Sequence, residues 1–306
     1  MPYLIAVSLI WALSFGLIKG RLVGLDSAFI TAVRLGLALL VFLPFLRPRG
    51  LGLARTLQLM ALGGLQFGLM YLAYNESFRH LQAYEVALLT LTTPVMVTLL
   101  ADALQRQWHP RSLGAALVAV AGTAIVVFQD KALAPTLTGV LWVQLSNLAF
   151  AAGQVGYKRW HEAARAAQPA LRDRDVFAWL YAGGTLVALV VLLARGGSSL
   201  PQTLSASQGL TLLYLGVVAS GLGFFLWNVG ATRVSAGQLA VMNNAKIPLA
   251  VACSLLVFGE QADPLRLLAS LALLGLAVWL ADRRGAPPAA STRLAVQQPL
   301  AEGARR

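Results

Sequence analysis

The chain has 306 residues, of which 58% are hydrophobic and only 12% are charged. Because soluble domains carry about 25% charged residues, this composition excludes a soluble globular protein, a disordered chain and a secreted disulfide scaffold. The net charge of +12 would suit a protein that binds nucleic acid. The same charge is expected of a membrane protein whose basic residues lie mainly on one side of the bilayer.

Ten stretches are apolar and long enough to cross a bilayer. A hydrocarbon core needs about 20 mostly apolar residues in a helix, and Ala- and Leu-rich runs lack the alternation of barrel strands. The stretches cover residues 3–19, 27–46, 56–75, 83–101, 111–128, 138–157, 175–194, 208–229, 236–258 and 264–281. The sequence therefore predicts an all-α membrane protein of ten transmembrane helices.

The Lys and Arg residues predict an orientation. With the N-terminus in the cytoplasm, sixteen of them lie in inside loops and six at outside ends, and two, Arg34 and Lys246, lie within spans. The positive-inside rule then places both termini in the cytoplasm of a bacterial inner membrane. This distribution accounts for the basic charge with the lipid bilayer as partner and no nucleic acid. Residues 283–306 are expected to form a disordered cytoplasmic tail.

Residues 59–79 and 212–232 match each other at a constant offset of 153. The matched pairs are Gly63 with Gly216, Gly68 with Gly221, Tyr71 with Phe224, Tyr74 with Trp227, and Asn75 with Asn228; one residue is then inserted, and Pro94 and Pro110 match Pro248 and Pro264. Each unit holds five spans, an odd number, so the second copy enters the membrane from the opposite side. We expect inverted repeats at 1–128 and 137–282, joined by a periplasmic connector at 129–136, with the binding site near the midplane.

Four features resemble the EamA branch of the drug/metabolite transporter superfamily: residues 9–15 within the first span, Arg34 in the second span, the join between the third and fourth spans, and Pro94 in the fourth span. The resemblance covers residues 3–282 and implies a secondary transporter of five plus five helices. The Gly-Glu pair usual after the fourth span is replaced by Ala101-Asp102, whereas Gly259-Glu260 is kept.

Several polar segments resemble, more closely, the biotin carriers of enterobacterial inner membranes within this branch. They are residues 143–147, 155–159, 216–221, 227–228, 230–232 and 242–244. Consecutive identities in polar stretches are more specific than shared hydrophobicity, so the resemblance implies biotin uptake.

Two cations lie inside predicted spans. A charged side chain at depth costs about 2.5–3.5 kcal/mol and normally faces a cavity or a partner, so Arg34 either contacts an anionic solute or forms a structural ion pair. Lys246 lies two residues before Pro248, which cannot donate to the carbonyl of Asn244. With Asn243 these groups would suit a ligand that has a polar ring and a carboxylate; the alternatives are snorkelling of the lysine and amide contacts between helices.

Amide and acidic side chains are further candidates. Gln144, Asn147 and Gln154 share one face of the sixth span, which faces either the cavity or neighbouring helices. Glu85 opens the fourth span and is either a carrier of a coupling proton or a solvated charge.

The remaining candidates are aromatic or structural. Trp11, Tyr74 and Trp227 either wall a pocket or belong to the interfacial belt. Residues expected to act as hinges, caps or structural elements are Asn75, Pro94, Asn228 and Pro248.

No Walker motif, phosphate loop or metal-ligand spacing occurs in the sequence, and Cys253 is the single cysteine. The chain is therefore expected to be a secondary carrier of a small organic solute and to need no cofactor or metal. It could act as a monomer or as a homodimer. An exporter of amino acids or related metabolites is the alternative. A membrane-embedded enzyme is disfavoured because no histidine or pair of carboxylates lies deep in a predicted span.

Overall fold

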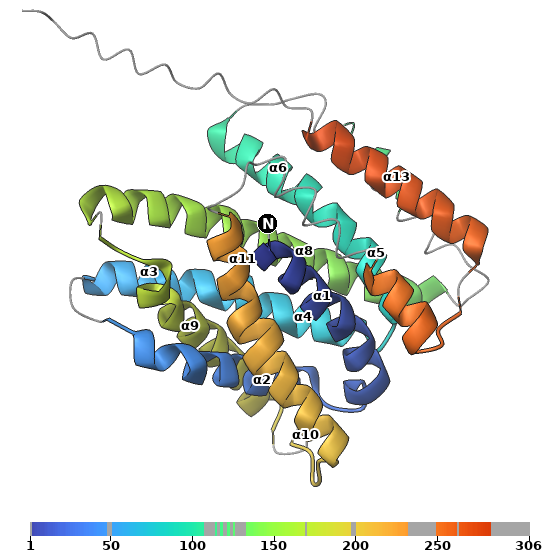
Figure 1. Ribbon diagram of the computed structural model, residues 1–306, viewed down its shortest axis with the longest axis horizontal. Coiled ribbons are helices and arrows are strands. Elements are labelled where there is room, and N and C mark those ends of the chain that lie inside the picture. The colour runs from blue at the N-terminus through green and yellow to red at the C-terminus, as the bar shows by residue number, and fades with distance from the viewer. Residues whose placement is uncertain are drawn as a thin grey trace, which may run out of the picture.

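A computed structural model describes residues 2–47, 51–106, 114, 117–118, 121–122, 125, 133–168, 170–196, 200–231, 249–261 and 263–282. Every regular element within these ranges is a helix (Figure 1). The first elements are α1 (Pro2–Leu17) with a π-helical turn η1 (Ile18–Leu22), α2 (Ser27–Phe42) with a 3-10 turn η2 (Leu43–Phe45), the continuous run α3 (Leu53–Gly63), η3 (Gly64–Leu69) and α4 (Met70–Ser77), and the run α5 (Ala83–Leu89), η4 (Thr90–Thr92) and α6 (Thr93–Gln105).

The later elements begin with a helix of 35 residues, α8 (Leu133–Ala167). They continue with α9 (Asp173–Ala194), the run α10 (Ala206–Leu213), η6 (Tyr214–Leu222) and α11 (Gly223–Ala231), a helix at residues 249–257, and α13 (Pro264–Asp282).

Five of these helices are long and apolar enough to cross a membrane, so the chain is a multi-pass membrane protein. They are Ile5–Leu22, Ser27–Phe45, Leu53–Ser77, Asp173–Ala194 and Ala206–Trp227. Two shorter apolar helices, Ala83–Val97 and Pro264–Ala277, lie within two further predicted spans. Most of the spans predicted at 111–128 and 236–258 lies outside the described residues, so the layout of ten helices stays a prediction.

The spans predicted at 138–157 and 175–194 leave residues 158–174 as a charged loop, and this expectation is wrong, because α8 continues to Ala167. Residues 158–167 include several strong helix formers, and Trp160 and Ala164 are buried in the same hydrophobic cluster as Val176 and Phe177 of α9. Packing on one helix face therefore outweighs the charge of the opposite face. His161 lies on this helix and not in a loop.

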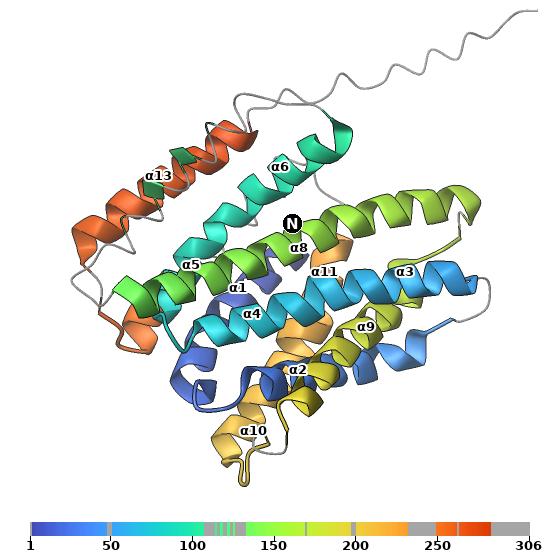
Figure 2. The ribbon, with the colours of Figure 1, turned by 180° about the vertical axis from the view of Figure 1, so that it is seen from behind.

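The helices pack into two large hydrophobic clusters and a small third one. The first large cluster includes residues of α1, α2, α5, α6, α8, α10, η6, 249–257 and α13; the second includes residues of α2, α3, η3, α4, α8, α9 and α11. Figures 1 and 2 show α6 and α13 side by side at one edge, with α8 running along α4 and α2 along α9. Trp11 and Tyr74 pack against both large clusters, so they mark the junction where the candidate site lies.

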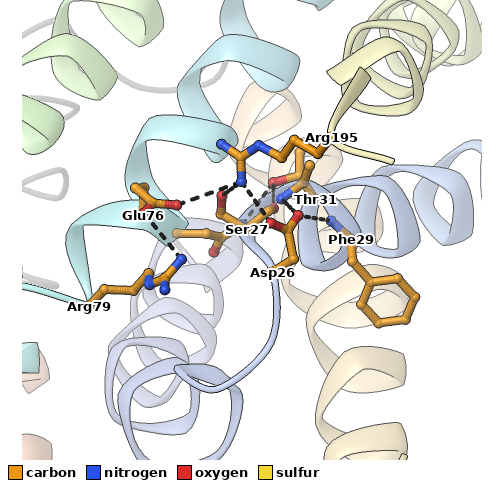
Figure 3. Close-up of polar contacts among 9 residues, drawn as sticks. Asp26, Ser27, Phe29, Thr31, Glu76, Arg79 and Arg195 are labelled. Atoms are coloured by element: carbon orange, nitrogen blue, oxygen red, sulfur yellow. Dashed lines mark hydrogen bonds and ion pairs between the residues drawn. The ribbon is translucent and has the colours of Figure 1, made fainter. Parts of the chain in front are cut away.

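A network of charged side chains links α2, α4 and α9 at one end of the bundle (Figure 3). Asp26 caps α2 through the N–H groups of Ala28 and Phe29, and its Oδ2 lies 2.7 Å from Nη1 of Arg195. The same Nη1 lies 4.0 Å from Oε2 of Glu76. The network therefore ties a helix of the later part of the chain to two helices of the first 128 residues.

A second polar link of this kind is made by Glu260. Its carboxylate accepts hydrogen bonds from the backbone N–H groups of Ala83, at 2.9 Å, and Tyr84, at 3.1 Å, and from the hydroxyl of Ser254. The first N–H groups of a helix have no partner within the helix. Glu260 therefore caps α5 from a distant part of the chain, which gives the Gly259-Glu260 pair a structural use.

Candidate functional site

A cavity of about 90 Å³ lies at the junction of the two large clusters and has room for several water molecules. Its wall comes from α1, α2, α4, η4, α6, α8 and α11. The lining residues are Trp11, Ser14, Phe15, Arg34, Met70, Tyr71, Tyr74, Thr90, Thr93, Ser146, Asn147, Phe150 and Phe224. Six of these thirteen residues are aromatic, and the wall also holds one charge, one amide and several hydroxyls.

The aromatic rings of the wall contact one another. The ring centroids of Trp11 and Phe224 are 4.9 Å apart, those of Phe15 and Tyr74 are 5.8 Å apart, and those of Phe150 and Phe224 are 6.1 Å apart. Such rings present a large apolar surface at little conformational cost. The arrangement suits a solute with a compact apolar body and few polar groups.

The backbone of η6 places a hydroxyl group, that of Ser220, beside the cavity. A π-helical turn widens the helix and changes the pairing of its carbonyl groups. Trp11 Nε1 donates to the backbone carbonyl oxygen of Ala219 at 2.9 Å. The hydroxyl of Tyr181 donates to the backbone carbonyl oxygen of Ser220 at 2.7 Å. These two bonds fix the position of the η6 backbone. The Oγ atom of Ser220 then faces Arg34.

Arg34 is buried, with 2% of its surface exposed. Its Nε and Nη2 donate to Ser220 Oγ at 3.4 and 3.3 Å, and its Nη1 donates to Asn75 Oδ1 at 3.4 Å. The guanidinium carbon lies 4.0 Å from the centroid of the Tyr71 ring, and the Tyr71 hydroxyl is 3.0 Å from Ser220 Oγ. Every one of these partners is neutral.

Within the described ranges, no carboxylate forms an ion pair with Arg34. A buried charge without a counter-ion is costly, and it is normally retained where a partner or solute compensates it. Because Arg34 also lines the cavity, its guanidinium is placed to bind an anionic group there.

Asn75 positions the guanidinium. Its Nδ2 donates to Thr31 Oγ1 at 2.9 Å, and the hydroxyl of Thr31 donates to the carbonyl oxygen of Ser27 at 2.7 Å. This chain of bonds leaves Oδ1 of Asn75 facing Arg34. Asn75 is not itself in the cavity wall.

The three amides of the predicted stripe on α8 have different surroundings. Asn147 lines the cavity and donates from Nδ2 to the Leu89 carbonyl oxygen and to Thr92 Oγ1, both at 2.9 Å. Gln144 accepts from the Thr92 hydroxyl at 2.8 Å and lies outside the wall. Gln154 is half-buried and also lies outside the wall.

Two other predicted binding residues lie behind the wall. Trp227 is buried against Trp11, with ring centroids 5.2 Å apart, and against Val7. Glu85 is buried at the third position of α5, where its Oε2 accepts from the N–H of Gln82 at 2.7 Å in a capping box.

The remaining predicted residues are placed only in part. Pro94 belongs to α6 and Asn228 to α11, and their side chains are not among those described. Asn243, Asn244, Lys246 and Pro248 lie outside the described residues. The proposed cluster around Lys246 therefore stays a prediction.

Tyr71 and Ser220 are site residues that the hydrophobic pattern does not single out. The match of Tyr71 to Phe224 is a usable signal, since both line the cavity. Ser220 offers no such signal, because serine is common in transmembrane helices and usually bonds to its own helix. Its role depends on the π-helical turn.

Comparison with known proteins shows what the chain is similar to. The model of the EamA-like transporter family matches residues 1–128 and 137–281. A biotin transporter of Salmonella typhimurium is 39% identical over 295 residues, covering 95% of this chain and 96% of the relative. A probable biotin transporter of Pseudomonas aeruginosa is 42% identical over 283 residues, covering 92% and 96%.

Two more distant similarities were also found. A probable terminal-alkyne amino-acid exporter of Streptantibioticus cattleyicolor is 27% identical over 286 residues, 90% of each chain. One crystal structure of a protein, 20% identical, has a TM-score of 0.61 and covers 92% of this chain and 98% of its own, a likeness of fold alone. The family match, the high coverage and the apolar helices agree: this chain belongs to the EamA-like transporter family.

Proposed function

We propose that this protein is a secondary transporter that takes up biotin across a bacterial inner membrane by alternating access. The observation that carries the proposal is Arg34, a buried cation in an aromatic cavity, without a carboxylate partner among the described residues. Biotin has a carboxylate for the guanidinium and a compact bicyclic body for the rings. The relatives named biotin transporters, at 39% and 42% identity over most of their length, support the same substrate.

The proposed architecture is ten transmembrane helices in two inverted repeats, at 1–128 and 137–282. Support comes from the π-helical turns η3 (Gly64–Leu69) and η6 (Tyr214–Leu222). At the offset of 153 found in the sequence, residues 64–69 correspond to 217–222, which lie within η6. Two π-helical turns at matched positions are an unusual shared feature, and both adjoin the helices that line the cavity.

The proposed orientation places both termini in the cytoplasm. It rests on the excess of Lys and Arg in the loops that this orientation puts inside. The network around Arg195 and the Glu260 cap then lie on the periplasmic side.

Export of amino acids is the second candidate, and the relative named as a probable exporter of an amino acid favours it. An amino-acid site has to hold an ammonium group as well as a carboxylate. The described part of the cavity wall contains no carboxylate for an ammonium group. This composition favours the monocarboxylate over the zwitterion.

The test is uptake of radiolabelled biotin in a biotin auxotroph that lacks its own carrier. Expression of this chain should restore growth at nanomolar-scale biotin, since a dedicated carrier works where passive entry is too slow. Desthiobiotin, which keeps the ureido ring, should compete. Lipoate, which keeps the sulfur and the acid but lacks that ring, should compete poorly. A well-expressed chain that restores no growth, or that lipoate inhibits as well as desthiobiotin does, would exclude biotin.

A further inference from the structure

The side-chain amide of Asn147 has a defined orientation in the cavity wall. The residue is 4% exposed, and one amide atom lies 2.9 Å from the carbonyl oxygen of Leu89. A backbone carbonyl oxygen can only accept a hydrogen bond, so this amide atom is the nitrogen. The second bond of the same nitrogen, to Thr92 Oγ1, also measures 2.9 Å.

The break between α5 and α6 explains why the Leu89 carbonyl is available. In a continuous α-helix this oxygen would accept from the N–H of Thr93, four residues later. Here η4 (Thr90–Thr92) is a 3-10 turn, and the Thr93 N–H bonds to the carbonyl of Thr90 instead. The Leu89 oxygen, released from the Thr93 N–H, accepts from Nδ2 of Asn147.

The carbonyl oxygen of the amide, Oδ1, is left as an acceptor. No described residue donates a hydrogen bond to this oxygen. The oxygen is also not fully enclosed by the protein. Because Asn147 lines the cavity, the occupant of the cavity can reach this oxygen. A buried acceptor left without a donor costs about 1–3 kcal/mol, so solutes that supply a donor are favoured.

We propose that Asn147 determines specificity by accepting a hydrogen bond from an N–H group of the solute, while Arg34 binds the carboxylate. The substrate class is a monocarboxylate whose other end is a cyclic urea or amide. A second carboxylate at that end would face the Asn147 oxygen and be repelled. This inference rests on the proposed function, because it takes the Arg34 cavity to be the solute site.

The test uses binding of two carboxylates to the purified full-length protein. Desthiobiotin carries ureido N–H groups, whereas 5-(2-thienyl)pentanoate has a ring and an acid but no N–H. The unaltered protein should bind desthiobiotin at least about tenfold more tightly, the value of one good hydrogen bond. In Asn147→Ala this preference should fall to less than about threefold, through weaker binding of desthiobiotin alone.

The matched control is Gln154→Ala. Gln154 is another amide of α8, half-buried and outside the cavity wall. This variant should keep the preference for desthiobiotin. A merely structural Asn147 would instead weaken the binding of both compounds equally.

The outcomes separate the two proposals. If the unaltered protein prefers desthiobiotin and Asn147→Ala keeps that preference, the role of Asn147 is wrong and biotin transport stands. If Gln154→Ala loses the preference to the same extent, the role of Asn147 is also wrong. If the unaltered protein binds neither compound, both proposals are wrong.

Discussion

Arg34 carries a positive charge into a span, and its described partners are a hydroxyl, an amide and an aromatic ring. Hydrogen bonds of 3.3–3.4 Å are long for N–H donors. A cation–π contact contributes about 0.5–2 kcal/mol. These contacts orient the guanidinium without neutralising it, so its charge remains for a solute anion.

Replacement of Arg34 should therefore affect acids more than neutral analogues. In Arg34→Ala the KM for biotin should rise by at least about tenfold, because a charge-assisted hydrogen bond contributes roughly 1.5–3 kcal/mol. Biotinamide, in which the carboxylate is replaced by a neutral carboxamide, should compete equally well against transport by either protein. The measurement is inhibition of labelled biotin uptake, with expression levels matched.

Arg47→Ala is the control, since this arginine is exposed and pairs with Asp175 away from the cavity. This variant should leave the KM for biotin and the inhibition by biotinamide unchanged. If Arg34→Ala weakens the binding of biotin and biotinamide equally, Arg34 is structural and the cavity has no carboxylate site there.

The sequence predicted part of this site. Arg34 and Asn147 stand out because a charge or amide within an apolar run has to face polar surroundings, and both line the cavity. Glu85 and Gln144 satisfy the same criterion but are used for capping and for a helix contact. Polarity within a span therefore identifies residues that avoid lipid, and only packing decides which of them reach the cavity.

At the scale of whole elements, α3 and α9 approach so closely that their backbones touch. A Cβ atom on Gly63 would overlap the backbone of Leu180, and one on Gly183 would overlap the carbonyl of Met60. Small residues of this kind permit close helix packing in membranes. α4, which continues from α3, packs against α8 at the cavity.

Gly183→Ala should thus destabilise the protein. Overpacking costs about 1–3 kcal/mol, here against backbone atoms that cannot move aside. The matched control is Gly36→Ala on α2, where a Cβ meets no atom within 4 Å. The melting temperature in detergent should fall for Gly183→Ala and stay the same or rise for Gly36→Ala. Equal melting temperatures for the two variants would contradict the close contact.

The ion pair between Arg195 and Asp26 joins α9 to α2 and is partly exposed. A double-mutant cycle with Arg195→Gln and Asp26→Asn should give a coupling of about 0.5–1 kcal/mol, typical of such pairs. The comparison pair, Arg266 with Asp263, joins residues only three positions apart at 3.8 Å and should give less. Zero coupling for Arg195 with Asp26 would mean that the pair does not hold α9 to α2.

Periodicity and hydropathy predicted the positions of most described helices, but not their internal breaks. The sequence has no signal for the π-helical turn η6, whose carbonyl groups accept from the distant side chains of Trp11 and Tyr181. It has none either for the 3-10 turn η4, which follows the Leu89 carbonyl that accepts from Asn147. The end of α8 was missed for a related reason. The charges at 158–165 predict a loop, and only the burial of Trp160 shows why the helix continues.

For the whole molecule, the proposed inverted repeats require a definite topology. Reporter fusions after residue 50 and at residues 170–172 should be cytoplasmic, and fusions at 129–136 should be periplasmic, because the basic loops face the cytoplasm. A periplasmic signal at 170–172 would contradict both the orientation and the inversion of the second repeat.

The proposed substrate is tested most directly by counterflow in proteoliposomes that contain the purified chain. Vesicles loaded with unlabelled biotin should transiently accumulate external labelled biotin, and vesicles with Arg34→Ala should accumulate much less at the same external concentration. This measurement needs no knowledge of the coupling ion or of the direction of transport in the cell. Counterflow of amino acids with none of biotin would contradict the account and identify the chain as an amino-acid carrier.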